Sequence, residues 1–370
     1  MVIKEIIERY LQLIETRDFL EYENDFANRL KEGISKGYRQ NLQEPKIVEA
    51  IVNKINKNRL SKTINRFHIS TTGIFIHGPK SVVEFEYYGT NTKRELGDLI
   101  FIISVIYNNK KYFEKLTITQ FKKSKKPKWE FRKNDKEQLY LLSRFPTFKM
   151  KIIKNDEIEE KEYNLPNYSN CLGSYGFLYK PGDFVFASAK IVEMSLGSKS
   201  NIKIEDIYNI GKTFLLEPFC ICYRRYCCYM DLFIPWKYIR YTVFPNYLLP
   251  IIGNSLYSSN VYEFSEKYLR SLIGDFVCAY ELPHNKKASH LLGDIIEKIK
   301  KKAQKDKDGK TLEYIKYFYK YEYYNGKIAK NFNNDNGNDG HGGEKFEKSE
   351  GAEDGGIGII HTIINLGEGR

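Results

Sequence analysis

Three polar residues in the first half of the chain have types and a spacing that suit chemistry at a phosphate. They are Asp98, Gln120 and Lys122, in the stretches GDLIFIISV and TITQFK. A carboxylate is a preferred ligand of Mg²⁺, and an amide carbonyl can add a neutral oxygen. A lysine beside such a cation can orient a water molecule or offset charge on a phosphate. If the fold brings these side chains together, we expect phosphodiester hydrolysis assisted by Mg²⁺ or Mn²⁺.

A predicted β-hairpin is the element that must position these residues. The apolar residues 99–107 and the residues 112–122 flank the turn signal NNKK, which is typical of two antiparallel strands. With a three-residue loop, Asp98 lies opposite Gln120, and Lys122 shares their face one pleat further on. A four-residue loop without a bulge would put Asp98 on the other face, because a slip of one residue exchanges the two faces.

The charge of the chain favours a polyanionic partner. The net charge of the 370 residues is +12. Residues 331–356 carry seven acids and two lysines, a net charge of −5, and residues 357–370 are neutral, so residues 1–330 carry +17. Nucleic acid is the commonest partner of such a basic body, although lysines also serve solubility alone. The basic run that follows Gln120 is predicted either to contact backbone phosphates or to form a solvated loop. Its lysines are Lys122, Lys123, Lys125, Lys126 and Lys128.

The order of the predicted elements indicates an α/β domain at residues 1–150. Helical spacing of apolar residues predicts helices within residues 2–37 and 47–55. Strands are predicted at 67–76 and 81–88, before the hairpin, and a helix at 136–145 follows it. We therefore expect a mixed sheet flanked by helices.

The remainder of the chain is predicted to form a second domain and a tail. Residues 151–324 mix strand and helix patterns, which indicates an α+β domain of unknown role. Residues 325–370 begin with a stretch of Gly, Asn and acidic residues that cannot bury enough apolar surface to fold, so we expect a disordered tail. Its apolar end, residues 357–366, could instead bind a partner or add a strand to a sheet.

No apolar run is long enough for a transmembrane helix, and the N-terminus reads as an amphipathic helix, so we expect a cytoplasmic protein without a membrane partner. Four of the six cysteines lie within residues 220–228 as CxCx4CC. This is not a spacing that zinc prefers, and small core residues are the simpler interpretation.

The order helix, strand, strand beginning with Asp98, strand ending in Gln120-x-Lys122, helix resembles the PD-(D/E)xK nuclease superfamily over residues 20–150. The resemblance implies a restriction-endonuclease-like core with Asp98 as a metal ligand, Gln120 in the place of the usual glutamate, and Lys122 as the catalytic lysine. Many members add a glutamate from the first helix, and Glu23 is the candidate for that third metal ligand. The alternative acids are Glu84, Glu86 and Glu95.

This chain departs from the family pattern at two positions. Gly97 stands where the family has proline, and Gln120 removes one negative charge from the metal site. The resemblance implies a metal-dependent endonuclease, with DNA as the expected substrate and restriction or defence as the setting. A nucleic-acid-binding protein with a degenerate nuclease fold is the alternative that Gln120 favours. A third interpretation is an interaction protein that recruits partners through its aromatic second domain and tail, and a homodimer stays open beside a monomer.

Overall fold

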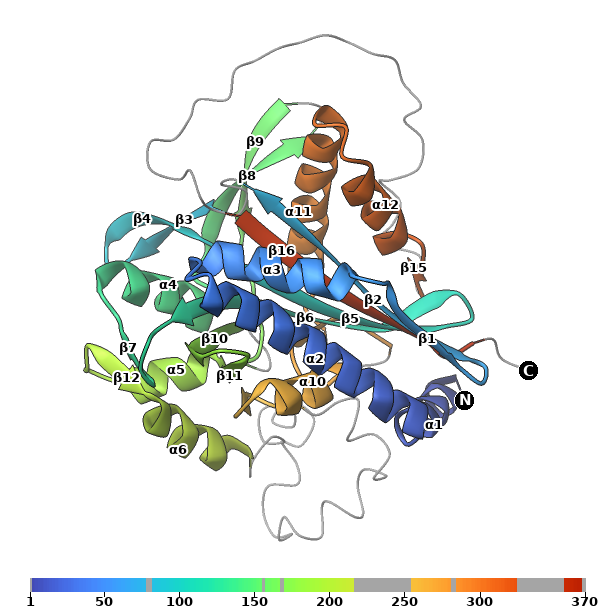
Figure 1. Ribbon diagram of the computed structural model, residues 1–370. Coiled ribbons are helices and arrows are strands. Elements are labelled where there is room, and N and C mark those ends of the chain that lie inside the picture. The colour runs from blue at the N-terminus through green and yellow to red at the C-terminus, as the bar shows by residue number, and fades with distance from the viewer. Residues whose placement is uncertain are drawn as a thin grey trace, which may run out of the picture.

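The computed structural model shows an α/β protein with a large mixed sheet flanked by helices, as predicted (Figure 1). Two of the predicted features, the CxCx4CC segment and most of the acidic tail, lie outside the described residues. The structure describes residues 2–77, 82–154, 157–166, 170–215, 254–280, 284–324 and 356–367.

Ten of the described strands form one sheet, in which strands from before and after residue 150 pair with each other. This pairing does not delimit a separate domain at residues 151–324, so the division of the chain into two domains stays a prediction. Eight strands follow one another in the order β1 (Leu60–Ile64), β2 (Phe67–His77), β16 (Gly356–Asn365), β5 (Leu99–Tyr107), β6 (Lys110–Lys123), β10 (Gly173–Lys180), β11 (Asp183–Ser188) and β13 (Tyr257–Ser258). Two further strands, β14 (Asp275–Ala279) and β15 (Glu322–Tyr323), also pair with β6.

Alternate residues of β5 and β6 fill two separate cores, as the period of two in a strand requires. Leu99 and Phe101 face one core, whereas Ile100 and Ile118 face the other. The first core is covered by α1 (Val2–Ile14), α2 (Arg17–Arg39), α3 (Glu44–Asn56) and α10 (Val261–Leu269). The second is covered by α4 (Lys133–Arg144), α5 (Ala189–Leu196), α6 (Ile204–Leu215), α11 (Lys286–Lys305), α12 (Gly309–Phe318) and a smaller sheet in the order β4 (Thr90–Glu95), β3 (Val82–Tyr87), β8 (Phe148–Lys154), β9 (Glu157–Tyr163).

The hairpin of β5 and β6 has the register that the sequence predicts at its open end, by a different route. Its loop is the two residues Asn108 and Asn109, with φ of 46° and 57°, the left-handed values that asparagine tolerates in tight hairpin turns. A bulge next to Val105 then adds one residue to β6, so that Leu99 pairs with Thr119. The bulge and the short loop together have the effect of the predicted three-residue loop, and Asp98 comes to lie across from Gln120.

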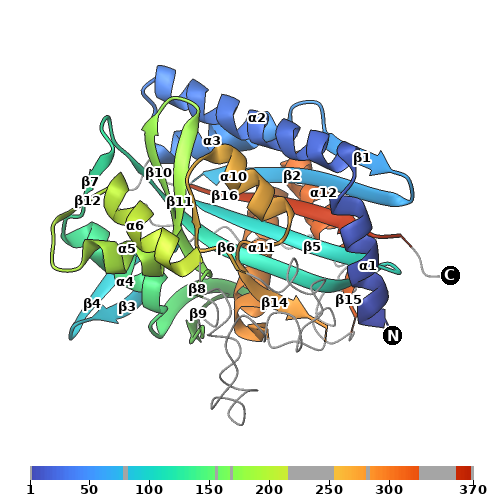
Figure 2. The same cartoon turned by 90° about the horizontal axis from the view of Figure 1, so that it is seen from below.

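The strand β16 lies in the middle of the large sheet, antiparallel to β2 and parallel to β5 (Figure 2). This differs from the predicted disorder at residues 356–365, because the apolar run buries almost every side chain between the two cores. Polar side chains of β16 are paired inside the sheet: His361 Nε2 lies 2.8 Å from Ser104 Oγ, and Thr362 Oγ1 lies 2.7 Å from Thr71 Oγ1. Burial lowers the pKa of His361 to about 3, so the imidazole is neutral in the core. These polar pairs match a strand that is built into the sheet.

A short two-stranded ribbon lies beyond the open end of the hairpin. It consists of β7 (Lys128–Glu130), which follows β6, and β12 (Asn201–Lys203). The chain then passes from β7 directly into α4, whose first turn lies close to the end of β6. The open end of the hairpin, the ribbon and the start of α4 therefore lie close together.

Candidate functional site

Asp98 is held rigidly at the open end of the hairpin. Its backbone N–H donates to Thr119 of β6 (3.0 Å), and its carbonyl accepts from Gly358 of β16 (2.8 Å). Asp98 as a whole is 2% exposed. Its Oδ2 accepts from the Phe121 N–H (2.7 Å) and from Gln120 Nε2 (2.5 Å), and neither bond uses Oδ1.

Burial raises the pKa of the Asp98 carboxyl to about 7, against the lowering effect of the Phe121 N–H. The negative charges of Glu95 and Glu44 raise it further, and the Lys122 ammonium opposes them. A carboxyl whose pKa is shifted this far by burial and by specific charged neighbours is typical of functional sites.

The structure places Gln120 directly beside Asp98, and a buried tyrosine lies on its other side. Tyr175 of β10 pairs with Gln120 in the sheet, and its ring packs near Phe131, with the ring centroids 6.0 Å apart. Within the described part of the chain, the buried Tyr175 hydroxyl has no hydrogen-bond partner. Burial raises the pKa of Tyr175 well above its ordinary value, and the charges of Asp135 and Asp98 raise it further, so both carboxylates lie near this ring. Tyr175 was not predicted as a site residue, because it lies on a strand that follows residue 150.

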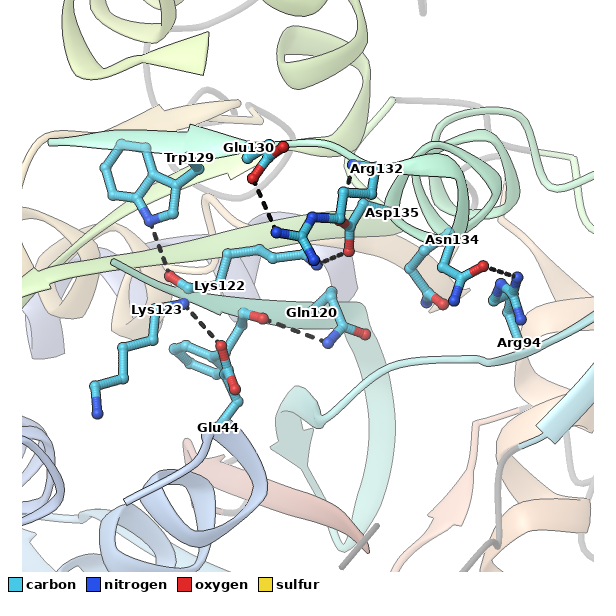
Figure 3. Close-up of polar contacts among 12 residues, drawn as sticks. Glu44, Arg94, Gln120, Lys122, Lys123, Trp129, Glu130, Arg132, Asn134 and Asp135 are labelled. Carbon is cyan, nitrogen blue, oxygen red and sulfur yellow. Dashed lines mark hydrogen bonds and ion pairs between the residues drawn. The ribbon is translucent and has the colours of Figure 1, made fainter. Parts of the chain in front are cut away.

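Lys122 shares the face of Asp98 and Gln120, but its ammonium forms an ion pair with Asp135 in the first turn of α4 (Figure 3). The other carboxylate oxygen of Asp135 accepts from the Arg132 N–H (3.0 Å), which satisfies a free donor at the start of the helix. Asp135 was not predicted, although an acid at the third position of a helix that follows a basic turn is a recognisable capping signal.

Glu23 lies elsewhere, although it was predicted as the third metal ligand. Its carboxylate binds Arg270 at the end of α10 (2.9 Å) and not the region of Asp98. Burial raises the pKa of Glu23, and Arg270 opposes that shift. The acids that act on Asp98 are Glu95, one of the predicted alternatives, and Glu44, which begins α3 directly before a proline. The proline after Glu44 is a sequence signal for the start of a helix, but nothing local shows that this start lies near Asp98.

The predicted basic loop borders a hollow at this end of the hairpin. Lys125, Lys126 and Lys128 are exposed. Lys123 is half-buried, and its ammonium donates to Asn41 Oδ1 and to the Leu42 carbonyl, both at 2.9 Å. The hollow, of about 760 Å³, is lined by Glu44, Lys122, Lys123, Ser124, Lys128, Trp129, Glu130, Arg132, Asp135, Ser200 and Asn201.

The described residues do not form a preassembled metal cage. Among them, no three His, Cys, Asp or Glu side chains lie close enough together to hold a metal ion. Mg²⁺, however, is commonly bound by one or two carboxylates, with waters and substrate phosphates as the other ligands. Asp98 Oδ1 and the Gln120 amide carbonyl, which points away from the Asp98 contact, fit a cation bound in this second way.

Gly97, which stands in the place of the family's proline, is explained by packing. A Cβ atom at this position would lie 2.7 Å from Ile118 Cγ2, which is too close for an ordinary contact. The chain therefore has room for glycine alone between β4 and Asp98 at this approach to the hairpin.

The comparisons with known proteins give no match: no family model, no curated protein and no solved structure matches this chain. In the part of the chain that the structure describes, no helix has the length and apolarity needed to cross a membrane.

Proposed function

We propose that this protein is a cytoplasmic, divalent-cation-dependent nuclease with a restriction-endonuclease-like core. Its substrate is nucleic acid, with DNA as the expected form. The observation that supports this best is the buried Asp98 carboxylate, held between β6 and β16 beside Gln120, on the strand face that also carries Lys122, which lines the hollow. The basic charge of residues 1–330 supports a polyanionic substrate.

Asp98 Oδ1 and Gln120 would hold the cation. Binding of the cation requires the ionised form of Asp98. The cation, when bound, supplies an activated water and offsets charge on the phosphate. Lys122 would bind the scissile phosphate in place of Asp135, because a lysine ammonium forms charge-assisted hydrogen bonds with phosphate as well as carboxylate oxygens. Lys123 and Lys128, which line the hollow, and the exposed Lys125 and Lys126 between them would position the backbone without reading sequence.

We expect the purified protein to cleave plasmid or single-stranded DNA in the presence of Mg²⁺ or Mn²⁺. Asp98→Asn and Lys122→Ala should each lower the cleavage rate by at least about 100-fold, the usual cost of losing a group that stabilises a transition state. Asp306→Asn, at an exposed carboxylate after α11, is the control and should cleave like the wild type. Cleavage that survives Asp98→Asn would refute the proposed site.

The Lys122–Asp135 ion pair gives a second prediction for the same surface. Asp135→Asn keeps a side-chain oxygen for the Arg132 N–H and frees the Lys122 ammonium, so we expect tighter DNA binding with a salt dependence steeper by about one unit of slope. The measurement is fluorescence anisotropy with labelled DNA over a series of salt concentrations. In a Lys122→Ala background the same substitution should have little effect. Weaker binding by Asp135→Asn alone would show that Asp135 serves the ligand and not the resting lysine.

A second candidate function is nucleic-acid binding without cleavage. The bond from Gln120 Nε2 to Asp98 favours it, because the amide is engaged with the carboxylate that a cation would need. Salt-dependent DNA binding, with no cleavage under any of the cation conditions and no effect of Asp98→Asn on affinity, would select this function over the nuclease.

A further inference from the structure

The ribbon of β7 and β12 carries a pair of lysines that the sequence gives no reason to connect. In its register Lys128 lies directly opposite Lys203, and Trp129 lies opposite Ile202. Trp129 and Ile202 are buried in the second core, whereas Lys128 and Lys203 are exposed. The alternation of faces along a strand therefore puts both lysines on the outer face of the ribbon.

Two like charges directly opposite each other destabilise a pair of strands. Within the described residues, neither of these two ammonium groups has an ion pair, and the nearby acids are engaged otherwise. Asp206 binds Lys199 (3.0 Å) and accepts from the backbone N–H of Lys203 (2.9 Å). Glu130 is paired with Arg132 (3.3 Å). The charge of Asp206 acts on Lys203 from a distance, but within the described residues no carboxylate forms an ion pair with either ammonium, so a bound anion would relieve the remaining repulsion.

Lys128 lines the same hollow as Lys122, and Lys203 lies directly opposite Lys128 in the ribbon. Asn201 of the ribbon and Asp135 line this hollow as well. Figure 3 shows the side chains of Trp129, Glu130 and Lys122 at this place, with the Trp129 Nε1–H donating to the Lys122 carbonyl (3.1 Å). This bond ties β7 to the end of β6, so the ribbon and Lys122 keep a fixed relation.

We propose that Lys128 and Lys203 form a clamp for one backbone phosphate of the nucleic acid, beside the phosphate that Lys122 receives. This rests on the proposed function only in the nature of the ligand, because a phosphodiester backbone would use the clamp whether or not it is cleaved. The directly opposed Cα atoms of an antiparallel pair lie about 4.5–5.5 Å apart, so two long ammonium side chains can reach one phosphate from both sides. Residues 201–203 thereby contribute to binding, although they lie far along the chain from the hairpin.

The test is a double-mutant cycle on DNA binding by the full-length protein. Lys128→Ala and Lys203→Ala should each weaken binding of a labelled duplex uniformly across sequences and reduce the salt slope by about 1. The double variant should resemble either single variant, because losing one lysine already opens the clamp. Two independent phosphate contacts would instead give additive losses and a slope reduced by about 2, which would overturn the clamp.

A second readout needs no nucleic acid. At low salt, each single variant should melt at the wild-type temperature or higher, because the cross-strand repulsion is relieved, and the gain should shrink as salt is added. A lower melting temperature would assign the lysines to the stability of the ribbon and contradict the clamp. The control is Lys57→Ala. Glu44, at the start of α3, lines the hollow, whereas Lys57 follows the other end of this 13-residue helix, about 20 Å away.

The outcomes also separate the clamp from the nuclease. If Asp98→Asn abolishes cleavage while both lysine variants bind DNA like the wild type, the clamp is wrong and the nuclease stands. If the wild type binds without cleaving and the cycle is non-additive, the clamp stands and the nuclease is wrong. Wild-type protein with no salt-dependent DNA binding overturns both.

Discussion

A chain that ends at Gly355 is expected not to fold. It lacks β16, which pairs with β2 on one side and with β5 on the other along almost its whole length. The truncation also removes five buried isoleucines from the two cores. Burial of each such side chain contributes about 1.5–3 kcal/mol to the free energy of unfolding. That sum is comparable to the whole stability of an ordinary domain, about 5–15 kcal/mol. Those isoleucines are Ile357, Ile359, Ile360, Ile363 and Ile364.

The control for this truncation is a chain that ends at Gly367 and keeps the whole strand. We expect it to give the far-ultraviolet circular dichroism and the cooperative urea transition of the full-length protein. The shorter chain should lack both and should bind a dye for exposed apolar surface. A cooperative transition of unchanged midpoint in the chain that ends at Gly355 would contradict the central place of β16. Addition of a peptide of residues 356–367 tests whether the strand can also complete the sheet from a separate molecule.

Replacing Asp98 by asparagine is expected to stabilise the protein at high pH. The folded pKa of this carboxyl, about 7, lies above its unfolded value near 3.8, so the folded state binds the proton more tightly. Its favourable contribution is complete below about pH 4 and is lost as the pH rises to about 7, at roughly 1.4 kcal/mol per pH unit. The wild type thus loses about 4 kcal/mol over this interval that Asp98→Asn does not lose. An asparagine carbonyl can accept both bonds, because both reach one oxygen of Asp98.

The measurement is the free energy of unfolding from urea titrations between pH 4 and pH 8, with a chelator present so that no cation favours the carboxylate. The difference between Asp98→Asn and the wild type should be small at pH 4 and should grow with pH. Asp306→Asn, at an exposed carboxylate, is the control and should run parallel to the wild type. A constant difference across the series would mean that Asp98 is not protonated in the folded protein at pH 5. If Asp98→Asn is more stable at high pH and no longer cleaves DNA, the wild-type carboxylate lowers stability in return for activity.

The hairpin could be predicted because its signals are local. Two asparagines favour the left-handed backbone of a tight turn, and the alternation of the flanking strands fixes which residues face each other. Asp98, Gln120 and Lys122 therefore lie where the sequence puts them. The bulge next to Val105 was not predicted, because a loop one residue longer has the same effect on the register at Asp98.

The other site residues depend on contacts between distant parts of the chain. Glu23 is one of many glutamates on helix surfaces, and its partner Arg270 is 247 residues away. Nothing in the spacing of Lys128 and Lys203 shows that they are neighbours, because the ribbon forms through the burial of Trp129 and Ile202. The place of β16 was missed for a similar reason: an apolar run after a polar, acidic stretch shows that a strand can form, but not which strands it joins.

The position of β16 has a consequence for synthesis of the protein. It follows every other described element in the chain, yet it separates β2 from β5, so a nascent chain has both strands ready long before the strand between them exists. At about 5–20 residues per second, the ribosome needs roughly 10–50 s to travel from Tyr107 to Asn365. During that time two long apolar strands carry unpaired edges, which are templates for aggregation. Chaperone protection of the growing chain, and removal of prematurely terminated chains, should therefore matter more for this protein than for one whose sheet is completed in the order of its sequence.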